Sequence, residues 1–235
     1  MQLTTITGGR TLHGRIGPAA AKNSVLPLLA ATLLCRTPSR LRAVPPLADV
    51  ATSLALLQSV GAKAERQGSD LFVAPGQDLQ GEIPDYLAGA MRSSVFYLAP
   101  LLCRVGEVRL PLPGGCKLGP RPVDIHLAGL AAMGAQVELE GIAVTLRRRG
   151  PLHGVDFALR LPSVGATMTL MMAATQAGGT TILRGAACEP EICDLANFLR
   201  ACGAHITGAG TPVVVIQGGK PLQGTAWTPL PDRIA

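Results

Sequence analysis

Leu152-His153-Gly154 is one copy of a tripeptide, Leu-[His/Gln]-Gly, that occurs four times in the chain. The other copies are Leu12-His13-Gly14, Leu79-Gln80-Gly81 and Leu222-Gln223-Gly224, so successive leucines are separated by 67, 73 and 70 residues. A Gly-Ala pair recurs in step with it, at Gly61, Gly134 and Gly203. Four copies in register with a second marker are hard to assign to chance. The sequence therefore predicts three similar units of about 70 residues and the start of a fourth.

Each unit has the same predicted order of elements. A few strand-like residues are followed by an apolar helix, a short strand, a turn with Pro and Asp, an amphipathic helix and a β-branched strand. The apolar helices are predicted at residues 24–35, 91–103 and 164–177, and each is apolar nearly all round, as expected of helices buried inside strands. Glycine of the Gly-Ala pair is predicted to stop each second helix.

The predicted fold class is α/β, with three similar units packed around a shared centre in one closed domain. A period of about 70 residues is too long for an ordinary solenoid. The fourth unit begins at Leu222 and stops at Ala235, before either helix could form. The chain therefore looks as though it ends where another domain would start.

Composition excludes several classes of protein. Hydrophobic residues make up 48% and charged residues 15%, which is not the composition of a disordered chain. The most apolar stretch, residues 24–35, is too short to span a membrane and contains Pro27. It also begins too far into the chain for a secretory signal, so we expect a cytoplasmic protein.

The six cysteines include no Cys-x-x-Cys pair and no zinc-site spacing, so no metal or cofactor is expected. Five of them lie in apolar, helix-like surroundings and are predicted to be core residues. The net charge of +6 suits an anionic partner, but aromatics are only 3%, which argues against nucleic acid. Small phosphorylated ligands explain the charge equally well.

The second unit contains an extra Gly-rich loop within residues 112–124, LPGGCKLGPRPVD. Glycines let a backbone approach a ligand closely. The central Cys116 is adjacent to Lys117, and a nearby cation favours the thiolate and lowers the pKa of a thiol. Two interpretations stay open from spacing alone: a reactive thiol, or a structural loop with an incidental cysteine.

Polar or basic residues begin the first helix of every unit. They are Lys22-Asn23, Arg92-Ser93 and Ser163, followed by Val164-Gly165. Helix N-termini offer free N–H donors and a positive dipole end, so they bind phosphate readily. Ordinary capping by Asn23, Ser93 and Ser163 is the alternative. Lys22 and Arg92 gain less from capping and are the better phosphate candidates.

Several motifs together resemble the UDP-N-acetylglucosamine enolpyruvyl transferases. The matching segments lie in the family's order from Gly8 onward: Ala21-Lys22-Asn23, Met91-Arg92-Ser93-Ser94, residues 112–126, residues 163–167, Glu189-Pro190-Glu191-Ile192 and Asp232-Arg233-Ile234. The cysteine loop is the most specific of them, because the sibling that makes 5-enolpyruvylshikimate-3-phosphate lacks it. The resemblance implies an inside-out α/β barrel fold with three repeats in each of two domains.

The resemblance also implies domain boundaries. Family chains begin in the second domain, build all of the first, and then return. Residues 1–21 would then be strands of the absent second domain, residues 22–230 the complete three-repeat domain, and residues 231–235 the start of the truncated second domain.

The reaction implied by the resemblance transfers the enolpyruvyl group of phosphoenolpyruvate to the 3-hydroxyl of UDP-N-acetylglucosamine and releases phosphate. It opens peptidoglycan synthesis and so serves cell wall biogenesis, cell shape and division. No cofactor or metal is implied. A complementary second half is a possible partner, because the family's second domain supplies an aspartate base and further arginines. The alternative is a non-catalytic UDP-sugar-binding or structural half-domain.

The family's functional residues map onto this chain one by one. Cys116 would be the general acid at the enolpyruvyl methylene. The phosphate and carboxylate of phosphoenolpyruvate would bind Lys22, Arg92 and Arg121. UDP-sugar contacts would come from Asn23, from Arg121, Pro122, Val123, Asp124 and His126 around the uracil, and from the backbone of Ser163, Val164 and Gly165 at the diphosphate.

Overall fold

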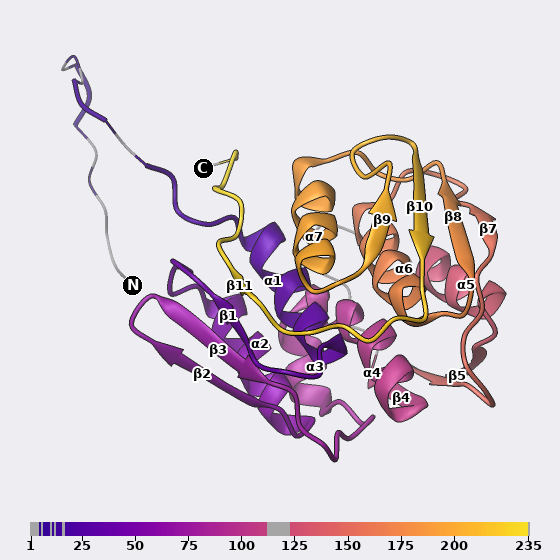
Figure 1. The fold of residues 1–235 in the computed structure, drawn as a ribbon. Helices are drawn as coiled ribbons and strands as arrows, with labels where there is room; N and C mark the ends of the chain where they lie inside the picture. The colour runs from indigo at the N-terminus through magenta and orange to yellow at the C-terminus, as the bar shows by residue number, and fades with distance from the viewer. Residues whose placement is uncertain are drawn as a thin grey trace.

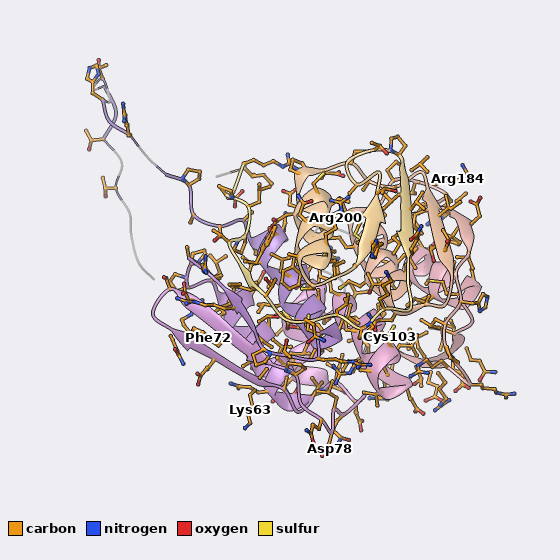
Figure 2. All side chains as sticks on the ribbon, viewed as in Figure 1. Lys63, Phe72, Asp78, Cys103, Arg184 and Arg200 are labelled. Atoms are coloured by element: carbon orange, nitrogen blue, oxygen red, sulfur yellow. The ribbon has the colours of Figure 1, made fainter. Side chains whose placement is uncertain are left out.

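The computed structural model describes residues 5, 7–9, 11, 13–15, 17–111 and 123–234. Three small sheets lie on the outside, around a central group of helices (Figure 1). Several strands of the outer sheets alternate between buried and more exposed residues, as Val213–Gln217 does, so one side of such a strand packs on helices and the other meets solvent. On the outer side, Lys63 and Asp78 point into solvent (Figure 2). The predicted three-unit α/β arrangement is confirmed.

The helices follow the predicted order, two principal helices to each unit. Their bounds are α1 Lys22–Ala31, α2 Ala48–Ser59, α3 Asp85–Ala90, α4 Leu98–Val105, α5 Asp124–Ala132, α6 Val164–Gln176 and α7 Pro190–Ala201, with 3₁₀ turns η1 Thr32–Leu34 and η2 Arg92–Tyr97. The first helices of the units are the most buried. In α6 every residue from Ala166 to Thr175 is buried, which explains why its sequence is apolar on all sides.

Each unit also carries one antiparallel sheet. The strands are β1 Ser39–Leu41, β2 Lys63–Gln67, β3 Asp70–Ala74, β4 Glu107–Pro111, β5 Gln136–Glu140, β6 Ala143–Arg147, β7 Asp156–Ala158, β8 Thr180–Arg184, β9 His205–Thr207, β10 Val213–Gln217 and β11 Ala226–Trp227. Their orders are β11-β1-β3-β2, β4-β6-β5 and β7-β8-β10-β9. Two of these sheets gain one parallel strand at an edge. In the third unit β7, which precedes α6, pairs with β8, and in the first unit β11, near the end of the chain, pairs with β1.

The second unit departs from the predicted single helix over residues 91–103. Its chain forms the short α3, then η2, and becomes α-helical only at Leu98. Pro100 gives the physical reason. A proline lacks an N–H and its ring collides with the carbonyl four residues earlier, so it is tolerated in the first turn of a helix. Starting α4 at Leu98 places Pro100 in that first turn.

The Gly-Ala pairs end the second helices as predicted. Gly61, Gly134 and Gly203 have φ of 95°, 103° and 109°, the left-handed conformation that follows a helix and favours glycine. Each glycine N–H donates back to the helix it ends, for example Gly203 N to Arg200 O at 2.9 Å.

The fourth tripeptide closes the first unit instead of starting a fourth. Leu222 forms a parallel bridge with Cys35, and its carbonyl accepts the N–H of Arg36 at 2.9 Å. The following strand, β11, then pairs with β1. In the third unit, Leu152-His153-Gly154 does the same for its own sheet, where His153 bridges Gly178. Residues 222–224 thus lead an edge strand into the sheet of the first unit, as residues 152–154 do in the third unit. This contact joins the end of the third unit to the first and closes the ring of units.

The glycine of the tripeptide is required by close approach of two backbones. A Cβ on Gly154 would lie 2.2 Å from Thr180 O, one on Gly81 2.1 Å from Glu107 O, and one on Gly224 2.1 Å from Pro38 O. Real Cβ atoms do not approach an oxygen this closely. The described part of the first copy differs, because Gly14 has nothing within 4 Å of its Cβ position.

We therefore expect Gly154→Ala to lower the free energy of unfolding by roughly 2–3 kcal/mol, since the added methyl forces the two strands apart. The matched control is Gly150→Ala, where the new Cβ would meet nothing within 4 Å. Urea denaturation of both variants measures the difference. Equal midpoints for the two variants would show that the close approach does not explain the repeated glycine.

Both ends of the described chain leave the domain side by side (Figure 1). Ala20 forms an antiparallel bridge with Pro231, Ala21 N donates to Leu230 O at 2.8 Å, and Asp232 N donates to Ala19 O at 2.8 Å. Two carboxylates of α7 fix the outgoing segment. Glu191 pairs with Arg233 at 3.1 Å, and Asp194 accepts from Trp227 Nε1 at 3.0 Å and from Leu230 N at 3.1 Å.

Candidate functional site

The start of α1 presents a lysine beside an acid. Lys22 is the first residue of the helix, and its Nζ lies 3.0 Å from Asp49 Oδ2 at the start of α2. About half of the Lys22 side chain, 51%, stays exposed. Asn23 is exposed and is not the cap, because the N-cap position is Ala21, which makes no side-chain capping bond. The capping explanation therefore does not account for either Lys22 or Asn23.

Arg92 begins η2 in the second unit and is partly buried. The residue before it, Met91, occupies the N-cap position without a side-chain cap, so Ser93 does not cap this turn either. The η2 turn packs against both α1 and α6. This packing places the Arg92 segment between the first helices of the other two units.

The start of α6 packs against α5 through a histidine. His126 is buried, and its Nδ1 lies 3.0 Å from Thr169 Oγ1 of α6. Its ring also fills the space beside Gly165, where an added Cβ would lie 3.1 Å from His126 Cε1 and Nε2. A glycine at this position is what allows the imidazole to lie against the first turn of α6.

Burial lowers the pKa of His126 to about 4, and the Asp124 carboxylate opposes the shift only partly. The imidazole is therefore neutral at physiological pH. A neutral imidazole can donate or accept a hydrogen bond without adding charge to the site.

This shift predicts how stability depends on pH. The pKa of His126 is lower in the folded state than the ordinary 6.5, so the unfolded chain binds the extra proton more readily and stability falls as the pH drops from 6.5 towards 4. The loss attributable to His126 should reach about 3 kcal/mol at the acid end. Urea unfolding of the parent chain and of His126→Gln across this pH range isolates the contribution of His126 to stability. The variant should show the flatter profile, and parallel profiles would contradict the buried neutral histidine.

Two further predicted residues lie at the same junction. Asp124 starts α5 and pairs with Arg160 at 2.6 Å, and this hydrogen bond holds the pKa of the carboxyl below its usual range. Ser163 is the N-cap of α6, since its Oγ accepts the N–H of Ala166 at 3.3 Å. Capping is thus confirmed for Ser163. Val164 and Gly165, which follow it, are half-buried at the helix start, as is Val123 before α5.

The described residues fall into two groups. Lys22 and Asn23 lie together at the start of α1. The second group lies where α5 of the second unit meets α6 of the third, namely Val123, Asp124, His126, Ser163, Val164 and Gly165. Arg92 lies on η2, which contacts both α1 and α6. Cys116, Arg121 and Pro122 lie outside the described residues, so the position of the thiol relative to these groups stays a prediction.

Three partners were not anticipated from the sequence. Asp49 pairs with Lys22, Arg160 with Asp124, and Thr169 with His126. Asp49 carried a weak signal, since an acid in the first turn of a helix is common. The other two come from packing between elements that are far apart in the chain. Among the described residues no group of three or more His, Cys, Asp and Glu could hold a metal ion, and none of the described helices is long and apolar enough to cross a membrane.

Comparison with known proteins places this geometry in context. The family model described as EPSP synthase (3-phosphoshikimate 1-carboxyvinyltransferase) matches residues 6–235. The chain is 47% identical over 230 residues, 97% of its length, to a UDP-N-acetylglucosamine 1-carboxyvinyltransferase of Gloeobacter violaceus, and covers 50% of that protein. It is 47% identical over 234 residues to the enzyme of that name from Oleidesulfovibrio alaskensis, covering 56% of it. The chain therefore spans about half the length of the curated relatives it matches.

Solved structures agree on the fold. The enolpyruvyl transferase NikO from Streptomyces tendae superposes with a TM-score of 0.82 at 24% identity, over 96% of this chain and 53% of NikO. EPSP synthase from Acinetobacter baumannii superposes with a TM-score of 0.74 at 18% identity, over 92% of this chain and 49% of that protein. At these identities the likeness concerns the fold alone.

Proposed function

The chain belongs to the EPSP synthase family of enolpyruvyl transferases, and from that premise we propose that it carries one half of a UDP-N-acetylglucosamine 1-carboxyvinyltransferase. The observation that carries the proposal is the 47% identity to enzymes of that name along almost the whole chain. The proposed substrates are phosphoenolpyruvate and UDP-N-acetylglucosamine. The reaction would be the first committed step of peptidoglycan synthesis, and we place it in the cytoplasm.

The proposed reaction proceeds by addition and elimination. The 3-hydroxyl of the amino sugar gives its proton to a base, proposed to be the aspartate of the second domain, and its oxygen attacks C2 of phosphoenolpyruvate while Cys116 adds a proton to C3. The product is a tetrahedral intermediate that still bears phosphate. Loss of a proton from the new methyl group and departure of phosphate restore the double bond. Cys116 is proposed as the general acid that delivers the proton to C3.

Lys22, Arg92 and Arg121 are proposed to bind the phosphate and carboxylate of phosphoenolpyruvate. Fixed cations stabilise negative charge as it moves along the reaction path. The geometry at Lys22 supports this role. Its ion pair with Asp49 is largely exposed, with 51% of the lysine and 35% of the aspartate side chain accessible. Such a pair holds the ammonium in place but is weak enough for a dianionic phosphate to compete for it.

The α5–α6 junction is proposed to bind the nucleotide. Neutral His126, fixed by Thr169, and Asp124, fixed by Arg160, would frame the uracil together with Arg121, Pro122 and Val123. The free N–H groups at Ser163, Val164 and Gly165 would meet the diphosphate, because a helix start presents donors and the positive end of its dipole. Asn23, exposed beside Lys22, is proposed to contact the sugar.

The proposed domain boundaries follow from the same family. Residues 22–230 would form the complete domain, and residues 1–21 and 231–235 would belong to a second domain. The pairing of Ala20 with Pro231 supports a junction at this place, since both segments leave the ring together. Closure of two domains excludes water and completes such a site, so the chain by itself should turn over little.

Reconstitution tests the proposal. Phosphate release from phosphoenolpyruvate and UDP-N-acetylglucosamine is measured with the chain alone, with a polypeptide covering the second half of the Gloeobacter violaceus relative, and with both. Turnover only in the mixture supports the split site, and Cys116→Ala in the chain should remove it. If the mixture is inert but the nucleotide sugar binds, the chain is a binding module without chemistry. If binding also fails, the proposal is wrong.

A further inference from the structure

Two buried cysteines meet where the ring of units closes. Cys35, directly after η1, and Cys202, at the end of α7, are 167 residues apart in the chain, yet their Sγ atoms lie 3.7 Å apart. This is van der Waals contact between two sulfur atoms. From this contact we infer that Cys35 and Cys202 form a redox-active thiol pair that peroxide converts to a disulfide between the first and third units. The inference does not depend on the proposed function.

The surroundings of Cys35 favour its thiolate. Arg104 donates to Cys35 O at 3.1 Å and to Leu33 O at 2.6 Å, so a guanidinium is fixed beside this residue. The contact with the Cys202 thiol lowers the pKa of Cys35, burial opposes this, and Ser39 and Arg104 lower it further. The Ser39 hydroxyl is buried and has no geometrically acceptable hydrogen-bond partner within the described part of the chain, which leaves its proton available to a thiolate.

The two thiols are not equivalent. The contact with Cys35 and burial raise the pKa of Cys202, and the Arg104 guanidinium, fixed at Cys35 O at 3.1 Å, favours the thiolate on Cys35. The thiolate is the nucleophilic form of cysteine. Cys35 is therefore the attacking thiol and Cys202 the resolving thiol of the pair.

The chemistry needs only a hydroperoxide as oxidant. The Cys35 thiolate attacks one oxygen of hydrogen peroxide and the O–O bond breaks. The departing hydroxide takes up a proton and leaves as water, and Cys35 becomes a sulfenic acid. The Cys202 sulfur then attacks that sulfur, the S–O bond breaks, and a second water leaves. Two thiols and one peroxide thus give one disulfide and two waters, and a reducing thiol such as dithiothreitol reverses the reaction.

The last tripeptide, residues 222–224, contacts the backbone of both cysteines. In this tripeptide Leu222 bridges Cys35, and the N–H of Gln223 donates to Cys202 O at 2.8 Å. Peroxide is close to water in size, so local opening of this segment admits it without unfolding the ring. Once formed, the disulfide would link the two backbone positions that this segment already holds together.

The test is oxidation of the full chain with hydrogen peroxide, followed by alkylation of free thiols and peptide mapping. A Cys35–Cys202 linked peptide is expected, with faster migration on a non-reducing gel and a thermal midpoint raised by roughly 5–10 °C, all reversed by dithiothreitol. Cys202→Ser should instead accumulate sulfenic acid on Cys35, trapped by dimedone, whereas Cys35→Ser should leave Cys202 unmodified.

Two other cysteines serve as controls. Cys188 is exposed, and Cys188→Ser should leave the cross-link intact. Cys103 has its pKa raised to about 12 by burial and should stay reduced. Oxidation of Cys188 without any Cys35–Cys202 peptide would overturn the inference. Equal dimedone labelling of Cys202 in Cys35→Ser would overturn the assignment of the attacking thiol. The search for the Cys35–Cys202 peptide uses the unsubstituted chain, so this experiment decides the question even if a variant folds poorly.

Discussion

Replacing Lys22 by alanine is expected to lower phosphate release in the reconstituted enzyme by roughly 10²–10³-fold, because a fixed cation that stabilises developing negative charge contributes on this scale. The fold should survive, since the side chain is half exposed and its ion pair with Asp49 is on the surface. Steady-state rates at varied phosphoenolpyruvate, with urea denaturation of the same preparations, separate the two effects.

Lys63→Ala is the matched control for this experiment. Lys63 is an exposed lysine on β2, and it points away from the central helices (Figure 2). Its loss removes the same charge from the chain without touching the proposed site. A Lys22→Ala enzyme as fast as the Lys63→Ala enzyme would exclude Lys22 from the phosphate site.

The largest expected loss of stability follows from Asp194→Ala. The buried carboxylate accepts hydrogen bonds from the Ser24 hydroxyl at the start of α1, from Trp227 Nε1 and from Leu230 N. Alanine leaves these donors without their acceptor, and breaking a buried charged network of this kind costs about 3–5 kcal/mol. Trp227 also packs edge-on against Phe198 with ring centroids 6.2 Å apart, so its fluorescence reports the same event during denaturation.

Asp156→Ala provides the comparison for that variant. Asp156 pairs with Arg184 at 2.7 Å on the outer sheet, where half of each side chain is exposed. Exposed ion pairs contribute little, so the denaturation midpoint should hardly move. If Asp194→Ala unfolds at the same urea concentration as Asp156→Ala, the hydrogen bonds of Asp194 to Trp227 and Leu230 do not stabilise the fold as proposed.

Much of the fold was predictable because each unit repeats the same local signals. The glycines at positions 61, 134 and 203 stop helices wherever they occur, and an all-apolar helix such as residues 164–177 must be buried. The role of Leu222-Gln223-Gly224 was not predictable in this way. Its local sequence matches the start of a unit, but its partner is Cys35, and pairing over so long a separation leaves no local mark.

The candidate site shows the same difference between local features and long-range contacts. Helix starts at Lys22, Arg92 and Val164 are local features and were predicted, whereas their partners in space were not. Capping was assigned equally to Asn23, Ser93 and Ser163, yet only Ser163 occupies an N-cap position. The other two helices start two residues earlier than capping by Asn23 or Ser93 would require, and their N-cap positions are Ala21 and Met91.

Cysteine burial shows a further limit of local patterns. Core positions were predicted for five cysteines, and this is confirmed for Cys35 and Cys202. It is wrong for Cys188, which is exposed, and Cys103 and Cys193 are intermediate. Cys188 lies in the turn before α7, where apolar neighbours in sequence do not determine which side chain meets solvent.

We propose that this chain carries the nucleotide-sugar side of an enolpyruvyl transferase site. The most direct test is a titration of the isotope-labelled chain with UDP-N-acetylglucosamine, followed by the amide resonances of His126, Ser163 and Gly165. We expect saturable shifts centred on these three amides, and none with N-acetylglucosamine lacking the nucleotide. Unmoved amides at a nucleotide-sugar concentration well above that used for turnover, or shifts confined to the outer sheets, would contradict it.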